Sequence, residues 1–214
     1  MAGPLPLFLL RTVLFPHMPL SLHVFEERYQ QMMADCLEAG SSFGVVAIRE
    51  GREVAGEARP HRVGTLARIA HVERLDDGRM NLLVAGASRF RITRQVEGKP
   101  YAQAEIEYLP EGDAEVSPAQ RRVLLRAFDR YLHSLSRVAE GDESPPELPD
   151  EDEALAYLVA ATLETSLDAR QQLLEADSPA ERMQMELKIL RREEDLLRRQ
   201  VLPATVVPGS FSEN

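Results

Sequence analysis

The chain has 214 residues, 44% hydrophobic and 28% charged, with a net charge of −10 at neutral pH. That composition excludes a fibrous or wholly disordered protein, and the length is enough to bury the core of one large unit or two smaller ones; we expect two. The acidity argues against a nucleic-acid partner, because that affinity depends on clustered cations.

Targeting and redox signals are sparse. The first residues lack the positive region and the long apolar run of a signal peptide, and no stretch is long enough to cross a bilayer. Cys36 is the single cysteine, so an internal disulfide and cysteine-built metal clusters are both excluded. We therefore expect a cytoplasmic protein without a membrane contact.

From Leu5 to about Leu109 the apolar residues mostly alternate with polar ones, as in half-buried strands. Asp76-Asp77-Gly78 separates two such runs, 63–75 and 80–96, and Asp-Gly tolerates the positive φ of a tight turn, so these runs predict a hairpin. Gly86 interrupts the second run and predicts a bulge at which the sheet bends. The pattern predicts a bent, closed, all-antiparallel barrel.

One helix is predicted among these strands, over 26–39. Its apolar residues recur at the spacing of a single buried helical face; they are Tyr29, Met32, Met33, Cys36 and Leu37. Glu26 and Glu27 suit the positive end of a helix, and Gly40 can adopt the left-handed conformation that ends one.

After Gly112 the apolar spacing becomes helical. Ser117 before Pro118 predicts one helix start, and Ser178 before Pro179 predicts another. We expect the first of these helices to bury a face made of Val123, Leu124, Ala127, Phe128, Tyr131, Leu132 and Leu135. Two helices are expected between, over about 153–164 and 168–175, and the last is expected to run to about Gln200 and bury Met183, Leu187, Leu190 and Leu197.

The two patterns predict an α+β chain with a barrel unit over 1–112 and a helical bundle over 113–203. The acidic, proline-rich run 140–153 is typical of a solvated linker, and 204–214 of a flexible tail.

Signals for catalysis are weak. Residues 40–44 match the G-x-S-x-G pattern that would make Ser42 a nucleophile, but that motif needs a strand before it and a helix after it, and the predicted order here is the reverse. The histidines lack the spacing of a zinc site; they are His17, His23, His61, His71 and His133. No phosphate-binding loop occurs. We expect no catalytic residue, metal or cofactor, with hydrolysis by Ser42 as the minor alternative.

Several segments together resemble the N-terminal substrate-binding domain of the Lon protease family. They are the run from Leu5 to Tyr29, which includes L-F-P-x-M-P-L-x-L-H-V-F-E-x-R-Y, then Phe43 to Val46, Val63 to Ile69 and Leu82 to Ile92. The resemblance implies a PUA-like barrel followed by a helical bundle, without the ATPase and protease modules of full Lon enzymes. Two residues depart from the family pattern: His17 where glycine is usual, and Glu27 where proline is common.

The resemblance also implies a non-catalytic module that binds unfolded polypeptide or a partner protein, with a separate protease as one candidate partner. We name Phe8 and Met18 as apolar contacts and Arg89 and Arg91 as contacts for an acidic partner. Within the stretch 14–30, Pro16 and Pro19 are expected to fix the loop and Phe25 to anchor the helix start.

Two further possibilities stay open. The PUA-like resemblance suggests RNA binding through Arg89, Arg91 and Arg94, against which the net charge argues. The last helix could also mediate a homodimer, although its apolar face suits the bundle core.

Overall fold

The computed structural model describes residues 3–50, 59–139 and 147–201, and of 137–139 and 195–201 it describes the backbone alone. The strands are β1 (Leu5–Leu10), β2 (Pro19–Val24), β3 (Phe43–Glu50), β4 (Arg59–Pro60), β5 (Val63–Arg74), β6 (Met80–Val96) and β7 (Gln103–Leu109). The helices are α1 (Glu27–Ala39), α2 (Pro118–Ala139), α3 (Asp152–Thr162), α4 (Leu167–Glu175) and α5 (Pro179–Val201). The predicted tail, 204–214, lies outside the described residues, as does 140–146 of the predicted linker.

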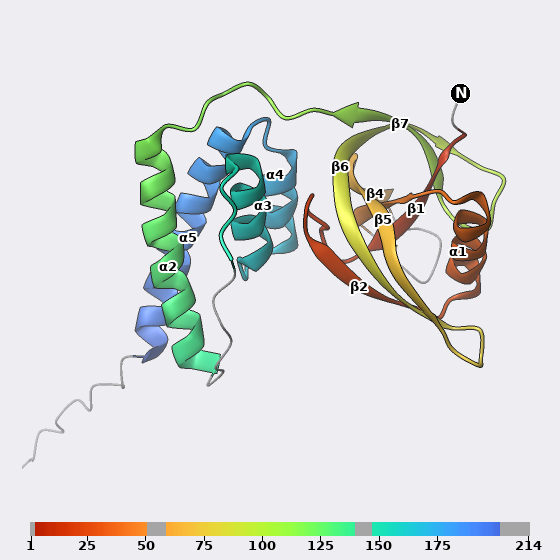
Figure 1. Ribbon diagram of the computed structural model, residues 1–214, viewed down its shortest axis with the longest axis horizontal. Helices are drawn as coiled ribbons and strands as arrows, with labels where there is room; N and C mark the ends of the chain where they lie inside the picture. The colour runs from red at the N-terminus through yellow and green to blue at the C-terminus, as the bar shows by residue number, and fades with distance from the viewer. Residues whose placement is uncertain (1–2, 51–58, 140–146, 202–214) are drawn as a thin grey trace, which may run out of the picture.

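The strands form one seven-stranded sheet in the order β1-β7-β6-β5-β3-β4, with β2 paired to β6 (Figure 1). A further pairing of β1 with β3 closes the sheet on itself, so the predicted α+β class with a barrel is confirmed. The β1–β3 pair is parallel, however, and the prediction of an all-antiparallel barrel was wrong at this point. Alternating apolar residues identify a strand but not the direction in which it pairs.

Helix α1 covers one opening of the barrel core. Tyr29, Met32, Met33 and Cys36 are buried on one face, as the sequence predicts, and Gly40 ends the helix in the left-handed conformation at φ 60°. The ring of Phe8 on β1 stacks on that of Tyr29 with centroids 4.0 Å apart. This contact fixes the start of α1 against β1.

The predicted hairpin joins β5 to β6, and the turn glycine, Gly78, has φ 85°. The register between the two strands shifts beside Gly86, where the sequence predicts a bulge. Gly86 also donates a backbone hydrogen bond to the carbonyl of Met18 (2.9 Å) and accepts one from the amide of His17 (3.0 Å). His17 lies at φ 64°, so it adopts the positive φ expected at the position where the family usually has glycine.

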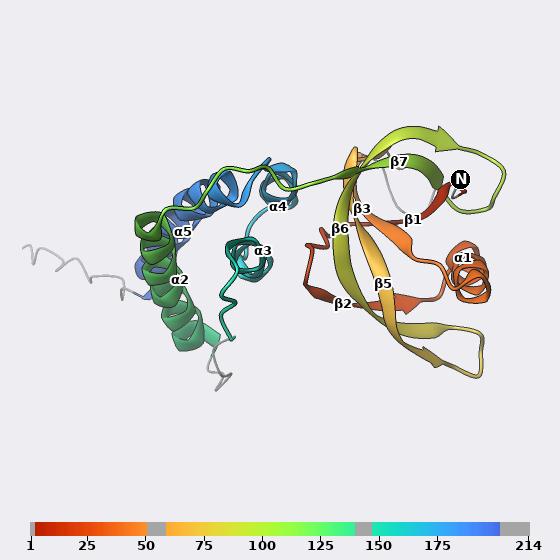
Figure 2. The same ribbon diagram turned by 45° about the horizontal axis from the view of Figure 1, so that its top comes forward.

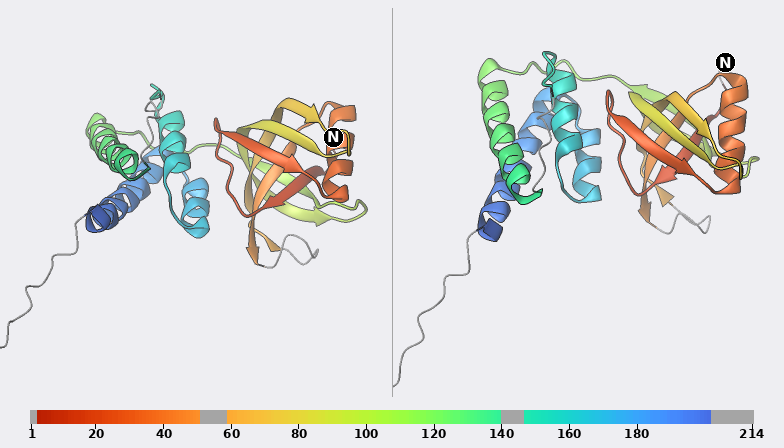
Figure 3. Two further views of the ribbon diagram at one scale, coloured as in Figure 1. Left: turned by 90° about the horizontal axis from the view of Figure 1, so that it is seen from below. Right: turned by 60° about the horizontal axis from the view of Figure 1, so that its bottom comes forward.

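The helices form two layers. Helices α3 and α4 lie between the barrel and the α2–α5 pair, and α1 lies on the far side of the barrel (Figures 2 and 3).

Ser117 and Ser178 accept hydrogen bonds from the amides of Gln120 (3.1 Å) and Glu181 (3.2 Å), which confirms both predicted helix starts. In the predicted apolar face of α2, Val123 is 44% exposed, which corrects its assignment to the core. None of the helices in the described ranges is long and apolar enough to span a bilayer.

Candidate functional site

Arg89, which we named as a surface contact, is buried where the barrel meets the helices. Only 3% of its surface is exposed. Its guanidinium forms an ion pair with Glu111 (2.8 Å) and donates hydrogen bonds to the carbonyls of Leu174 (2.8 Å) and Ala176 (2.6 Å). This corrects the prediction that Arg89 contacts a partner, because every one of these groups belongs to the fold.

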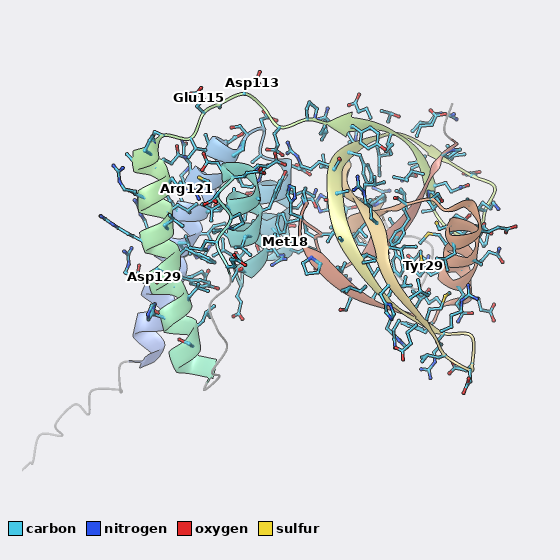
Figure 4. All side chains as sticks on the ribbon, viewed as in Figure 1. Met18, Tyr29, Asp113, Glu115, Arg121 and Asp129 are labelled. Atoms are coloured by element: carbon cyan, nitrogen blue, oxygen red, sulfur yellow. The ribbon has the colours of Figure 1, made fainter. Side chains whose placement is uncertain are left out.

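Met18 lies at the same junction. Its side chain is half-buried against the helical core, and Figure 4 shows it on the side of the barrel that faces the helices. Nearby, Arg182 of α5 is fully buried, pairs with Glu111 (3.1 Å) and lies over the ring of Tyr157 (4.0 Å). Met18 is therefore placed to hold the barrel against the helices.

Arg91 and Arg94 are exposed, and each is paired with a carboxylate on the neighbouring strand β7. Arg91 donates to Glu107 (3.1 Å) and the Nε of Arg94 donates to Glu105 (3.0 Å). Together with the burial of Arg89, these pairs mean that the three arginines of the RNA hypothesis do not share a free cationic surface. These contacts of the described residues give no support to a nucleic acid as the partner.

Ser42 lies between the end of α1 and the start of β3, so the order of elements is the reverse of that in a nucleophile elbow. In the described part of the chain its hydroxyl has no hydrogen bond to a histidine or a carboxylate. The thiol of Cys36, which lines the same hollow as Ser42, is buried, and burial raises its pKa. The described residues also contain no group of three or more potential metal ligands.

An apolar groove lies at the α1 end of the barrel, between β1, β2 and the start of α1. Its volume is about 260 Å³, and it is lined by Phe8, Leu10, Thr12, Leu20, Ser21, Leu22, His23, Phe25, Glu26 and Tyr29. Phe8, only 3% exposed, forms part of the floor and belongs to the core, which corrects its prediction as a free surface contact. Phe25 is 60% exposed at the rim.

The exposure of Phe25 also corrects the prediction that it anchors the helix. On β2 the side chains of Leu20, Leu22 and Val24 point toward the core while their neighbours point outward. Phe25 follows Val24 and so falls on the outward parity with His23, whose ring stacks against it at 6.0 Å. The alternation that predicted the strand thus contained the signal for an exposed aromatic residue.

Five of the side chains that line the groove carry a polar group, and those of His23, Glu26 and Tyr29 have partners within the fold. The Tyr29 hydroxyl accepts a hydrogen bond from the Leu9 amide and donates one to the Leu9 carbonyl, both at 3.3 Å. Glu26 is paired with Arg28 (2.9 Å), whose guanidinium lies over the Tyr29 ring. The arrangement offers a mainly apolar surface whose one carboxylate, Glu26, is paired with Arg28.

A larger hollow, of about 710 Å³, lies on another side of α1 and includes Asp35, Tyr101 and Tyr108 in its lining. Two of its charged groups, Asp35 and Lys99, pair with each other, and hydrogen bonds from Tyr101 (2.6 Å) and Lys99 (3.0 Å) lower the pKa of Asp35 to about 2. These contacts tie the loop after β6 to α1. We therefore take the smaller groove, with its exposed Phe25, as the candidate site.

The barrel with its apolar groove and the helical bundle beside it define an α+β class of protein, and comparison with known proteins gives its family. Residues 4–192 match the family described as ATP-dependent protease La (LON) substrate-binding domain, and the chain belongs to this family. Two relatives are Lon protease 2 of Herpetosiphon aurantiacus, 32% identical over 88% of this chain, and Lon protease of Desulfovibrio desulfuricans, 30% identical over 85%. The alignments span 24% and 21% of those relatives, so the chain covers about a quarter or less of their length.

The solved structures agree with this family. The Lon N-terminal domain protein from Xanthomonas campestris is similar with a TM-score of 0.66 and 28% identity, over 87% of this chain and 98% of that one. The N-terminal domain of Mycobacterium avium complex Lon protease has a TM-score of 0.61 and 18% identity, over 88% of this chain and 98% of that one, and supports the fold alone.

Proposed function

We propose that this protein binds exposed apolar segments of other polypeptides, without cleaving them, in the groove between β1, β2 and α1. The observation that carries the proposal is the 60% exposure of the aromatic Phe25 at the rim of a mainly apolar groove. Exposed aromatic residues beside a hydrophobic hollow are typical of sites that bind proteins. Membership of a substrate-binding domain family supports a polypeptide as the ligand.

The proposed role is that of a binding module, with unfolded polypeptide or a partner protein as ligand. The family match covers a substrate-binding domain, and Ser42 lacks the surroundings of a nucleophile within the described structure. Cooperation with a separate protease and action in the cytoplasm belong to the same proposal.

Binding to reduced casein tests the proposal. We expect the protein to bind casein and to hydrolyse neither casein nor ATP. We expect Phe25→Ala to weaken casein binding about tenfold, because an aromatic side chain that becomes buried in a complex contributes at least that much to the affinity. Tyr108→Ala is the matched control, since Tyr108 is 62% exposed and lies outside the groove. Equal binding by both variants, or hydrolysis at an ordinary enzymatic rate, would contradict the proposal.

A further inference from the structure

The outer edge of β2 is an unpaired strand edge along the groove. On its other side β2 pairs with β6, from Pro19 opposite Ala85 to Val24 opposite Met80. Within the described residues no strand pairs with its second edge; β1, which lines the facing wall of the groove, pairs with β3 and β7. The strands β1, β7, β6, β5 and β3 thus close the barrel, and an open seam separates β2, which lies off this circuit, from β1.

The register identifies the backbone groups that face this seam. The amide of Gly86 on β6 donates to the carbonyl of Met18 (2.9 Å), so Met18, just before β2, directs its carbonyl toward β6. Hydrogen-bonded and non-hydrogen-bonded pairs alternate along an antiparallel ladder, and therefore Leu20 and Leu22 direct their amides to β6. Ser21 and His23 direct their N–H and C=O groups away from β6, toward the groove.

The two walls of the seam differ. On β1 the N–H and C=O of Leu9 are both hydrogen-bonded to the hydroxyl of Tyr29. On β2 the corresponding groups of Ser21 and His23 have no protein partner in the described structure. Pro19 starts this edge without an N–H group, which suits a position at the end of an open strand. An incoming chain would therefore pair with β2 rather than with β1.

The groove also has a preferred charge. Among the described residues that line it, Glu26 is the one carboxylate, and neither lysine nor arginine is present. Arg28 forms an ion pair with one oxygen of Glu26 (2.9 Å) and partly balances its charge. A ligand with a basic residue near Glu26 is complementary to this lining, and an acidic ligand is not.

We propose that a polypeptide binds in extended form as an added strand on the outer edge of β2. Its backbone pairs with Ser21 and His23, alternate apolar side chains enter the groove beside Phe25, and a basic residue lies near Glu26. This inference rests on the proposed function and adds the mode of binding and the ligand class: an extended apolar and basic segment. Strand addition supplies affinity through the backbone and selectivity through alternate side chains.

The test uses a labelled peptide of about ten residues, the length of a long strand, with leucine or valine at alternate positions and arginine at one end. Versions N-methylated at alternate amides block one edge of the peptide or the other. We expect one methylated version to bind at least tenfold more weakly than the unmodified peptide and the other to bind nearly as well. Equal binding of all three would overturn strand addition. Replacing the arginine of the peptide by glutamate should weaken its binding. Unchanged binding of the glutamate peptide would contradict the charge preference.

Variants of the protein give the second arm. Ser21→Pro removes the outward N–H without removing a bond to β6, and we expect at least tenfold weaker peptide binding, while Ser21→Ala stays within about twofold. Circular dichroism checks that both variants fold, and the methylated peptides test the same point on the unaltered protein. If Phe25→Ala abolishes binding but Ser21→Pro and the methylated peptides bind normally, strand addition is wrong and the proposed function stands. If neither casein nor peptide binds, both fail.

Discussion

Gly86 shows how a single residue shapes the barrel. A Cβ atom added there would lie 2.1 Å from the carbonyl oxygen of Phe15, which belongs to the backbone and cannot rotate away. The absence of a side chain lets the loop before β2 approach β6, where Met18 accepts a hydrogen bond from Gly86 and His17 donates one to it. The position of β2, and with it one wall of the groove, depends on this close approach.

We therefore expect Gly86→Ala to lower the free energy of unfolding by about 1–3 kcal/mol, the usual result of forcing atoms into a filled space. Urea denaturation followed by circular dichroism measures the change. Gly3→Ala is the control, because an added Cβ at Gly3 meets nothing within 4 Å. If the two substitutions have equal effects, the steric account of Gly86 is incorrect.

At the scale of elements, α5 contains a buried acid. Glu186 is fully buried, and neither of its carboxylate oxygens has a hydrogen-bond partner among the described residues. Burial raises its pKa well above the usual 4.5, and the charge of Arg182 only partly opposes that rise. The raised pKa favours the neutral form of Glu186 in the folded protein.

A raised pKa in the folded state has a definite sign for stability. Above about pH 4 the unfolded chain releases the proton of Glu186 while the folded protein retains it, so the free energy of unfolding falls as pH rises. Glutamine does not ionise, so we expect Glu186→Gln to remove this fall in the free energy of unfolding. The variant should be more stable than the unaltered protein by about 1 kcal/mol or more at pH 8, and equally stable near pH 4. Thermal or urea unfolding across this pH range measures it. Glu38→Gln, at an exposed position on α1, should show no such trend.

At the scale of the whole molecule, Glu111 connects the barrel to the helices. It pairs with Arg89 of β6 and Arg182 of α5 and accepts a hydrogen bond from the Tyr157 hydroxyl. Both arginines are buried, so they depend on this carboxylate for their charge balance. A second link is the side-chain amide of Gln171 on α4, which donates to the carbonyl of Val63 on β5 (3.0 Å).

Glu111→Ala would leave two buried guanidinium groups without their shared carboxylate. We expect it to lower the free energy of unfolding by about 3–5 kcal/mol, as measured by urea denaturation. Glu107→Ala removes the partner of Arg91 on the surface, where both side chains are about half exposed, and should change the free energy by less than about 1 kcal/mol. Similar losses in the two variants would contradict a special role for the buried pair.

The sequence determined the local structure of this protein. Apolar alternation, the turn at Gly78, the left-handed end of α1 at Gly40 and the serine caps before α2 and α5 were predictable, because each depends on neighbours within a few residues. The motifs in the first half were also sufficient to indicate the family that the match over residues 4–192 shows.

The tertiary structure decided what depends on residues far apart in the chain. Arg89 and Arg91 lie on the same strand and on the same side of it. Arg89 is buried because α4 packs against it, whereas Arg91 remains exposed and pairs with Glu107 on β7. The parallel pairing of β1 with β3, the open edge of β2 and the groove beside Phe25 likewise depend on which strands meet. The spacing of apolar residues indicates which face of a strand or helix a residue occupies. Which other element packs against that face depends on the chain topology, and a local sequence pattern carries no information about it.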